Sequence, residues 1–187
     1  WSSDGTASGT IPVATLEGGL PLVVSESPRR VCFLELFEPE DAHRVWCTDG
    51  SRGATFALAS AAGTRLFPFY GTRVAAESGD RLFVAACEQG KARCGVWSHS
   101  GAAPTSLFLA PTPSGFYGGL TLVALSGRAY YSYGAELWSV DGSEPGQRLV
   151  LTAGHGGIRG LTVVNGRLYF IAFGDGGDEL WSSDGSS

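Results

Sequence analysis

The sequence predicts an all-β fold built from repeats, and three observations lead to this prediction. A Trp-Ser-Ser-Asp-Gly-Thr segment at Trp1 recurs in related form four more times and accounts for all five tryptophans. Short runs of Val, Ile, Leu and aromatic residues lie between these segments, punctuated by Gly, Asp, Asn and Ser. No window carries the 3.6-residue apolar stripe of an amphipathic helix. About four short antiparallel strands per roughly 40–50 residues are typical of a β-propeller blade.

Each repeat contains the same short strands in the same order. The tryptophan-bearing strands begin at Trp1, Trp46, Trp97, Trp138 and Trp181. Before the last four of them comes an apolar strand opened by an arginine, namely Arg30, Arg81, Arg128 and Arg167. A further apolar run lies upstream of each arginine, and another follows each tryptophan segment. Residues 1–187 are therefore expected to form a single β-propeller-type domain of about four repeats, each with four antiparallel strands.

The distance from the leading arginine to the tryptophan keeps the strand pairing constant. It is 16 residues in the first two repeats, then 10, then 14, so all the differences are even. An even change in a hairpin loop keeps every side chain on its face of the sheet, whereas an odd change reverses them. We therefore expect one hairpin register in all four copies.

The four cysteines fit this register. Directly opposed residues in an antiparallel hairpin have a constant sum of positions, and the sums for Cys87–Cys94 and Cys32–Cys47 differ by twice the 51-residue offset between these repeats. Opposed Cβ atoms lie close enough for a disulfide. The sequence predicts disulfides Cys32–Cys47 and Cys87–Cys94 in preference to free thiols or a zinc site. Disulfides persist in oxidising compartments, so an extracellular, periplasmic or cell-surface location is expected.

At these residues the chain resembles the bacterial ELWxSDGT repeat family, whose members are often long, secreted proteins expected to form propellers. The fullest match runs from Arg167 to Ser186, and Trp1 to Thr10 supplies the second half of the motif. Glu136 to Ser143 is a good third copy, whereas the segments at Trp46 and Trp97 have diverged. The resemblance implies a scaffold and no activity, because the family has no settled catalytic residues.

The number of strands is compatible with more than one way of closing the ring. The tryptophan strand occurs five times and each other strand four times, so the segments at Trp1 and Trp181 compete for one place in a closed four-bladed ring. The simplest explanation is a window on a longer array, part of a larger ring. The alternatives are a four-bladed ring with one frayed end, or a strand that pairs with a neighbouring chain.

Two sets of acidic residues are candidate ligand sites. Asp-Gly pairs recur at Asp4, Asp49, Asp141 and Asp184, where a tight turn with glycine at positive φ explains them better than a ring of ligands. Asp175, Asp178 and Glu179 could coordinate Ca²⁺, which favours clustered carboxylates. The expectation is a hairpin tip without a resident cofactor, with Ca²⁺ the alternative.

The loops before each first strand vary most between repeats, and two of them are rich in aromatic residues. Exposed aromatic patches mark binding sites for proteins or sugars. The candidate binding residues are Phe67, Phe69, Tyr70, Phe116 and Tyr117. The alternative is that these side chains cover the core between blades.

Charge and composition limit the function. The net charge of −5 disfavours nucleic acid as the main partner. The sequence contains no run of about 18 apolar residues, so a membrane-spanning helix is not expected. No nucleophile or metal motif is present, so catalysis is not expected. The prediction is a non-enzymatic binding or assembly module with protein partners, a peripheral subunit of a larger complex. The alternative is a lectin-like carbohydrate-binding propeller, against which the differences between the loops count.

Overall fold

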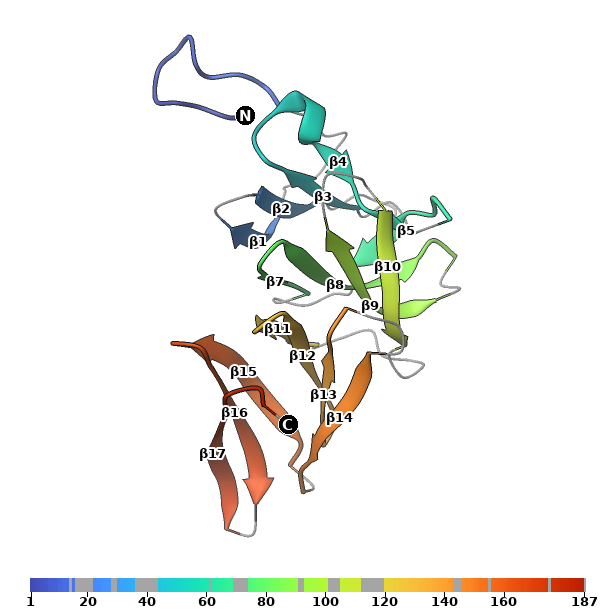
Figure 1. Cartoon of the computed structure of the whole chain (residues 1–187), viewed down its shortest axis with the longest axis vertical. Coiled ribbons are helices and arrows are strands. Elements are labelled where there is room, and N and C mark those ends of the chain that lie inside the picture. Colours follow the sequence, from blue (N-terminus) through green and yellow to red (C-terminus); the bar gives the residue numbers. More distant parts are fainter. Residues whose placement is uncertain are drawn as a thin grey trace.

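A computed structural model describes most of the chain. The described residues are 1–13, 15, 22–27, 30–35, 44–60, 62–68, 74–90, 93–100, 105–111, 120–142, 146–154, 156–174 and 176–186. Within them the fold is all-β, as the sequence predicts, and the one helical element is a 3-10 turn at Arg52–Ala54. Seventeen strands form four small sheets, which follow one another along an open arc (Figure 1).

Each sheet is built from consecutive antiparallel strands. Sheet 1 contains β1 (Leu22–Ser27), β2 (Arg30–Glu35), β3 (Arg44–Thr48) and β4 (Phe56–Ala57). Sheet 2 is centred on β7 (Ala75–Ser78), β8 (Arg81–Glu88), β9 (Cys94–Ser100) and β10 (Thr105–Pro111). Sheet 3 contains β11 (Leu122–Leu125), β12 (Arg128–Tyr133), β13 (Glu136–Val140) and β14 (Gln147–Thr152). Sheet 4 contains β15 (Ile158–Val164), β16 (Arg167–Gly174) and β17 (Gly177–Ser183).

Two sheets depart from the expected four strands. In sheet 2, β5 (Ala59–Ser60) pairs in parallel with β10, and β6 (Leu66–Pro68) pairs with the far end of β8. Strand β8 is long enough to pair with β7 along its first half and with β6 along its second. Phe67, expected in a loop, therefore lies in strand β6, opposite Cys87. In sheet 4 only three strands are described.

The hairpin register is the same in all four sheets. The tryptophan lies opposite the third residue after the leading arginine in every copy: Phe33↔Trp46, Val84↔Trp97, Tyr131↔Trp138 and Phe170↔Trp181. This confirms the register that the even loop differences predict. The cysteines are directly opposed as well, with Cα–Cα distances of 4.2 Å for Cys32–Cys47 and 3.9 Å for Cys87–Cys94, and both pairs are disulfide-bonded. Such short distances are typical of the pairs in an antiparallel ladder that do not exchange backbone hydrogen bonds.

The core consists of three apolar layers between consecutive sheets. One layer joins sheets 1 and 2 and includes Val45, Leu82 and Trp97. The next joins sheets 2 and 3 around Phe83 and Tyr131. The third joins sheets 3 and 4 and includes residues such as Leu137, Leu168 and Phe170. Sheets 2 and 3 are covered on both faces, whereas sheets 1 and 4 lie at the two ends of the arc (Figure 1).

The two disulfides should contribute differently to stability. The Cys32–Cys47 bond closes a separation of 15 residues and the Cys87–Cys94 bond a separation of 7. Because the entropy removed from the unfolded chain rises with loop length, Cys32→Ala/Cys47→Ala should cost about 3 kcal/mol and Cys87→Ala/Cys94→Ala about 2 kcal/mol. Urea denaturation of both variants measures this. A larger loss from the shorter loop would contradict the expectation.

Candidate functional site

Sheet 4 exposes an apolar side chain that the other sheets bury. The residue before the tryptophan is fully buried in the first three sheets (Val45, Val96 and Leu137, each 0% exposed), whereas Leu180 is 76% exposed. Each buried counterpart lies in an apolar layer shared with the following sheet. No further sheet follows β17 in the described residues. Leu180 is therefore exposed because the surface that covers its counterparts is missing.

The exposed apolar surface extends beyond Leu180. Ile171 pairs with Leu180, so the two side chains share a face of the sheet. Along β16 the alternate residues Leu168, Phe170 and Ala172 are buried against sheet 3, while the residues between them point the other way. We call this second surface of sheet 4 the outer face. Its apolar residues are Val164, Tyr169, Ile171, Phe173 and Leu180, and the Arg159–Asp178 ion pair lies on the same face. An apolar surface of this kind is typical of a protein interaction site.

The same sheet has an unpaired strand edge. In sheets 1, 2 and 3 the tryptophan strand pairs on both sides, with β4, β10 and β14 as the outer partners. Strand β17 pairs with β16, and no other described strand lies along its second edge. We call this second edge the open edge. Unpaired N–H and C=O groups on such an edge are ready to pair with an added strand.

The Asp-Gly segments form tight turns, as predicted. Gly5, Gly50, Gly142 and Gly185 all have positive φ, between 82° and 93°. The Oδ1 atoms of Asp4, Asp49 and Asp184 each accept a hydrogen bond of 2.9 Å from the backbone N–H two residues later.

These hydrogen bonds also affect protonation. The backbone N–H of Thr6 lowers the pKa of Asp4, and that of Ser51 lowers the pKa of Asp49. The Ser186 hydroxyl and backbone N–H lower the pKa of Asp184. In these three turns a carboxylate oxygen is thus already used by the backbone.

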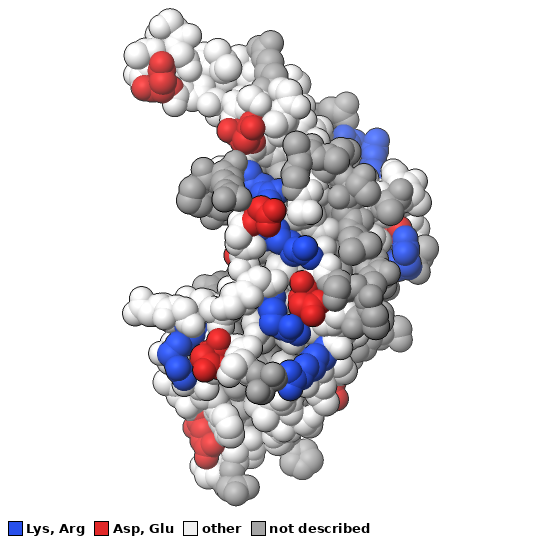
Figure 2. All heavy atoms as spheres, viewed as in Figure 1, with Lys and Arg blue, Asp and Glu red and all other residues white. Residues whose placement is uncertain are grey.

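In sheets 1, 2 and 3 a polar side chain of the arginine-led strand contacts the next sheet or the turn that follows it. Arg30 of sheet 1 forms an ion pair with Glu77 of sheet 2 (Nε–Oε1 2.7 Å), and the Nη1 atom of Arg81 donates to the carbonyl oxygen of Gly142 (2.7 Å). In sheet 3 the Tyr130 hydroxyl donates to the Gly185 carbonyl oxygen at 3.1 Å. Figure 2 shows basic and acidic side chains side by side along the hollowed flank of the molecule. This flank therefore carries both signs of charge, and no single-sign field forms there to attract a polyanion.

The Ca²⁺ candidate is described only in part. Asp175 lies outside the described residues. Asp178 forms an ion pair with Arg159, whose positive charge offsets one of the carboxylates, and Glu179 is exposed. Within the described ranges, no cluster of three or more His, Cys, Asp and Glu side chains could hold a metal ion. Ca²⁺ binding at this hairpin tip stays a prediction.

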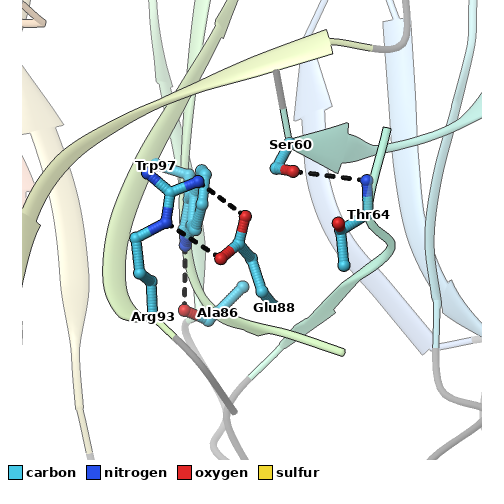
Figure 3. Close-up of polar contacts among 6 residues, drawn as sticks. All are labelled: Ser60, Thr64, Ala86, Glu88, Arg93 and Trp97. Carbon is cyan, nitrogen blue, oxygen red and sulfur yellow. Dashed lines mark hydrogen bonds and ion pairs between the residues drawn. The ribbon is translucent and has the colours of Figure 1, made fainter. Parts of the chain in front are cut away.

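A partly buried polar cluster lies at the tip of the β8–β9 hairpin (Figure 3). Glu88 is buried and accepts two hydrogen bonds from Arg93, at 2.9 and 2.7 Å. The Arg93 guanidinium lies 5.3 Å from the Trp97 ring centroid, and the indole N–H donates to the Ala86 carbonyl oxygen at 2.9 Å. The bonds from Arg93 lower the pKa of Glu88. Arg93 thus contacts both the Trp97 ring and the Glu88 carboxylate, beside the Cys87–Cys94 disulfide.

Sequence reasoning missed this cluster, and it gave an unpaired strand only as one of three alternatives without saying which strand it would be. The position sum that places Cys87 opposite Cys94 also places Glu88 opposite Arg93, so the signal for the ion pair was present in the sequence. The exposure of Leu180 had no local signal, because Glu-Leu-Trp-Ser occurs both at Leu137 and at Leu180. Only the absence of a covering sheet separates these two leucines.

The predicted aromatic binding residues fall largely outside the described part of the chain. Phe69, Tyr70, Phe116 and Tyr117 are not among the described residues, and for Phe67 the structure describes the backbone in β6. Their role in binding stays a prediction.

Comparisons with known proteins identify no relative. No protein-family model matches the chain, and no curated protein matches it at a significant level. Among the described residues no helix has the length and apolar character needed to cross a bilayer.

The arginine contact between sheets 2 and 3 predicts a difference between two glycines. A Cβ at Gly142 (φ +86°) would lie 1.6 Å from Nη1 of Arg81, whereas a Cβ at Gly79 (φ +67°) has nothing within 4 Å. Gly79→Ala should cost about 1–2 kcal/mol through backbone strain alone. Gly142→Ala should cost roughly 1 kcal/mol more, because the bond to Arg81 is displaced as well. Equal unfolding free energies for the two variants in urea would contradict the role of Arg81.

The Glu88–Arg93 pair predicts a pH-dependent contribution to stability. Because the folded-state pKa of Glu88 is lowered, the ion pair stabilises the fold above the ordinary pKa of 4.5 and loses its effect as the pH falls through the folded-state value. Arg93→Gln should cost about 1 kcal/mol at neutral pH, since Arg93 is half exposed and screened by solvent. The cost should shrink in acid.

Arg65→Gln is the matched control, because it removes the same charge from an exposed side chain. Urea denaturation of both variants at neutral and acidic pH measures the contribution. A cost for Arg93→Gln that does not change with pH would show that the ion pair contributes nothing.

Proposed function

We propose that this chain is a non-enzymatic, extracytoplasmic binding and assembly module of the β-propeller type. It contacts a protein partner through the outer face and the open edge of sheet 4. Consecutive antiparallel sheets with one shared register, arranged along an arc, support the propeller assignment, as does the resemblance to ELWxSDGT repeats. The two disulfides support an oxidising compartment.

One observation carries the protein-binding proposal. Leu180 is 76% exposed where its three counterparts are 0% exposed, and it lies beside a strand edge that has no described partner. A partner that adds a strand to this edge gains main-chain hydrogen bonds. It gains apolar burial at the same time if it also covers the outer face.

Binding assays with two kinds of probe test the proposal. The chain is immobilised sparsely, so that copies stay apart, and offered a random twelve-residue peptide library and a glycan array. We expect peptides with alternating apolar residues to be enriched and their binding to fall at least tenfold in Leu180→Arg. Glu179→Arg is the matched control, because it places the same side chain at an exposed neighbouring position. Glycan binding that is insensitive to Leu180→Arg, without peptide binding, would favour the lectin alternative instead.

A further inference from the structure

The first residues of the chain form a hairpin that repeats the outer half of a sheet. Ser2 and Ile11 exchange two backbone hydrogen bonds of 2.9 Å each. This pairing has the register found between the tryptophan strand and its outer partner in sheets 1, 2 and 3, where the equivalent pairs are Cys47↔Phe56, Ser98↔Leu107 and Ser139↔Arg148. Residues 10–13 thus occupy the position of an outer strand, but no described sheet continues behind residues 1–3.

The two ends of the molecule carry complementary halves of one sheet. The N-terminal hairpin has an outer strand and only a short tryptophan strand, and Trp1 is 83% exposed. Sheet 4 has three strands and a tryptophan strand without an outer partner. Trp1-Ser-Ser-Asp-Gly is identical in sequence to Trp181-Ser-Ser-Asp-Gly. Either segment therefore presents the same groups to residues 10–13.

The turns that follow the two segments have the same geometry. The Gly5 N–H donates to the Ser3 hydroxyl at 3.0 Å, and the Gly185 N–H donates to the Ser183 hydroxyl at 3.1 Å. Gly5 and Gly185 have φ values of +90° and +82°. In the N-terminal hairpin the Ser3 hydroxyl also contacts the Thr10 hydroxyl at 2.7 Å. Ser183 is preorganised to make that contact in place of Ser3.

Pro12 determines which side of the outer strand is available. Its ring leaves it without an N–H, and proline in a sheet is confined to the position that does not donate to a neighbour. Since Ile11 donates toward the tryptophan strand, the Pro12 nitrogen faces the opposite edge. A new strand therefore joins residues 10–13 on the side that Trp1–Ser3 now occupies, by taking their place.

The sheet faces at the two ends fit the same arrangement. In sheet 2, the face that carries Trp97 packs on sheet 1. The equivalent face of sheet 1 carries Val31, Phe33 and Trp46. A preceding sheet would pack on this face. Val31 is exposed, and Phe33 and Trp46 are half-buried. The outer face of sheet 4 is the surface where a following sheet would lie. Both end surfaces carry exposed apolar side chains, Val31 on sheet 1 and Leu180 on sheet 4.

Together these features point to a second copy of the chain as the occupant of the open edge, an inference that rests on the proposed function. We propose that β17 of one copy displaces residues 1–3 of another and pairs with residues 10–13, with Ser182 opposite Ile11. Sheet 4 of the first copy then packs on sheet 1 of the second. Such head-to-tail contacts close into a ring when the rotation permits. Two copies supply eight of the described sheets, within the range of about 4–8 blades in closed propellers.

Sedimentation analysis of the 187-residue chain at micromolar to millimolar concentration tests the proposal. We expect a species of twice 19.5 kDa. Ser182→Pro removes the N–H that faces the open edge and should give a monomer, whereas Ser182→Ala keeps that N–H and should remain dimeric. Ile11→Pro should also give a monomer, with Ile11→Val as its control.

Mixing the two proline variants tests the head-to-tail geometry directly. A Ser182→Pro copy still offers residues 10–13, and an Ile11→Pro copy still offers β17, so the mixture should form a heterodimer although each variant alone is monomeric. Contact between two identical edges predicts no such complementation. Hydrogen exchange of the unsubstituted chain gives a second readout that does not depend on the variants, because the Ser182 amide should become protected as concentration rises.

A monomer at every concentration, or a dimer that Ser182→Pro leaves intact, would overturn the inference. The same experiments distinguish failure of this inference from failure of the proposed function. If the chain is monomeric but the immobilised protein binds library peptides in a Leu180-dependent way, sheet 4 binds a different protein partner. If peptide binding is absent while Ser182→Pro still abolishes the dimer, the surface serves self-assembly alone.

Discussion

The constant register between the arginine-led strand and the tryptophan strand is the constraint from which the other features follow. Side chains in a strand alternate between faces, so a slip of one residue would move every apolar side chain of that strand to the opposite surface. In all four hairpins the tryptophan lies opposite the third residue after the arginine. The two disulfides, the Glu88–Arg93 pair and the three apolar layers between sheets all depend on this alignment.

Packing between sheets is directional, and this direction determines which apolar side chains stay exposed. Each sheet offers the residue before its tryptophan to the following sheet and the tryptophan side to the preceding one. A linear series of such units has two unlike ends. The hydrogen bonds from Arg81 to Gly142 and from Tyr130 to Gly185 connect successive sheets in the same direction.

The indole N–H groups show how much local variation the scaffold tolerates. Trp46 donates to the Glu35 carboxylate, Trp97 to a backbone carbonyl oxygen and Trp138 to the Glu136 carboxylate. A buried donor must find an acceptor, but the fold does not prescribe which atom supplies it. Side chains around the tryptophans can therefore diverge while the register stays constant, which is consistent with the altered segments in the second and third repeats.

The sequence by itself determined the repeats, the hairpin register and the cysteine partners, because each depends on pairing between neighbouring strands with a period of two residues. It did not predict β5 and β6, which pair with β10 and β8 in sheet 2. The exposed surface of sheet 4 depended on something else. Leu137 and Leu180 lie in the same Glu-Leu-Trp-Ser segment, yet one is 0% and the other 76% exposed. Only the tertiary structure decided which leucine is exposed, because burial is set by the presence or absence of a neighbouring sheet and not by the residues on either side in the chain.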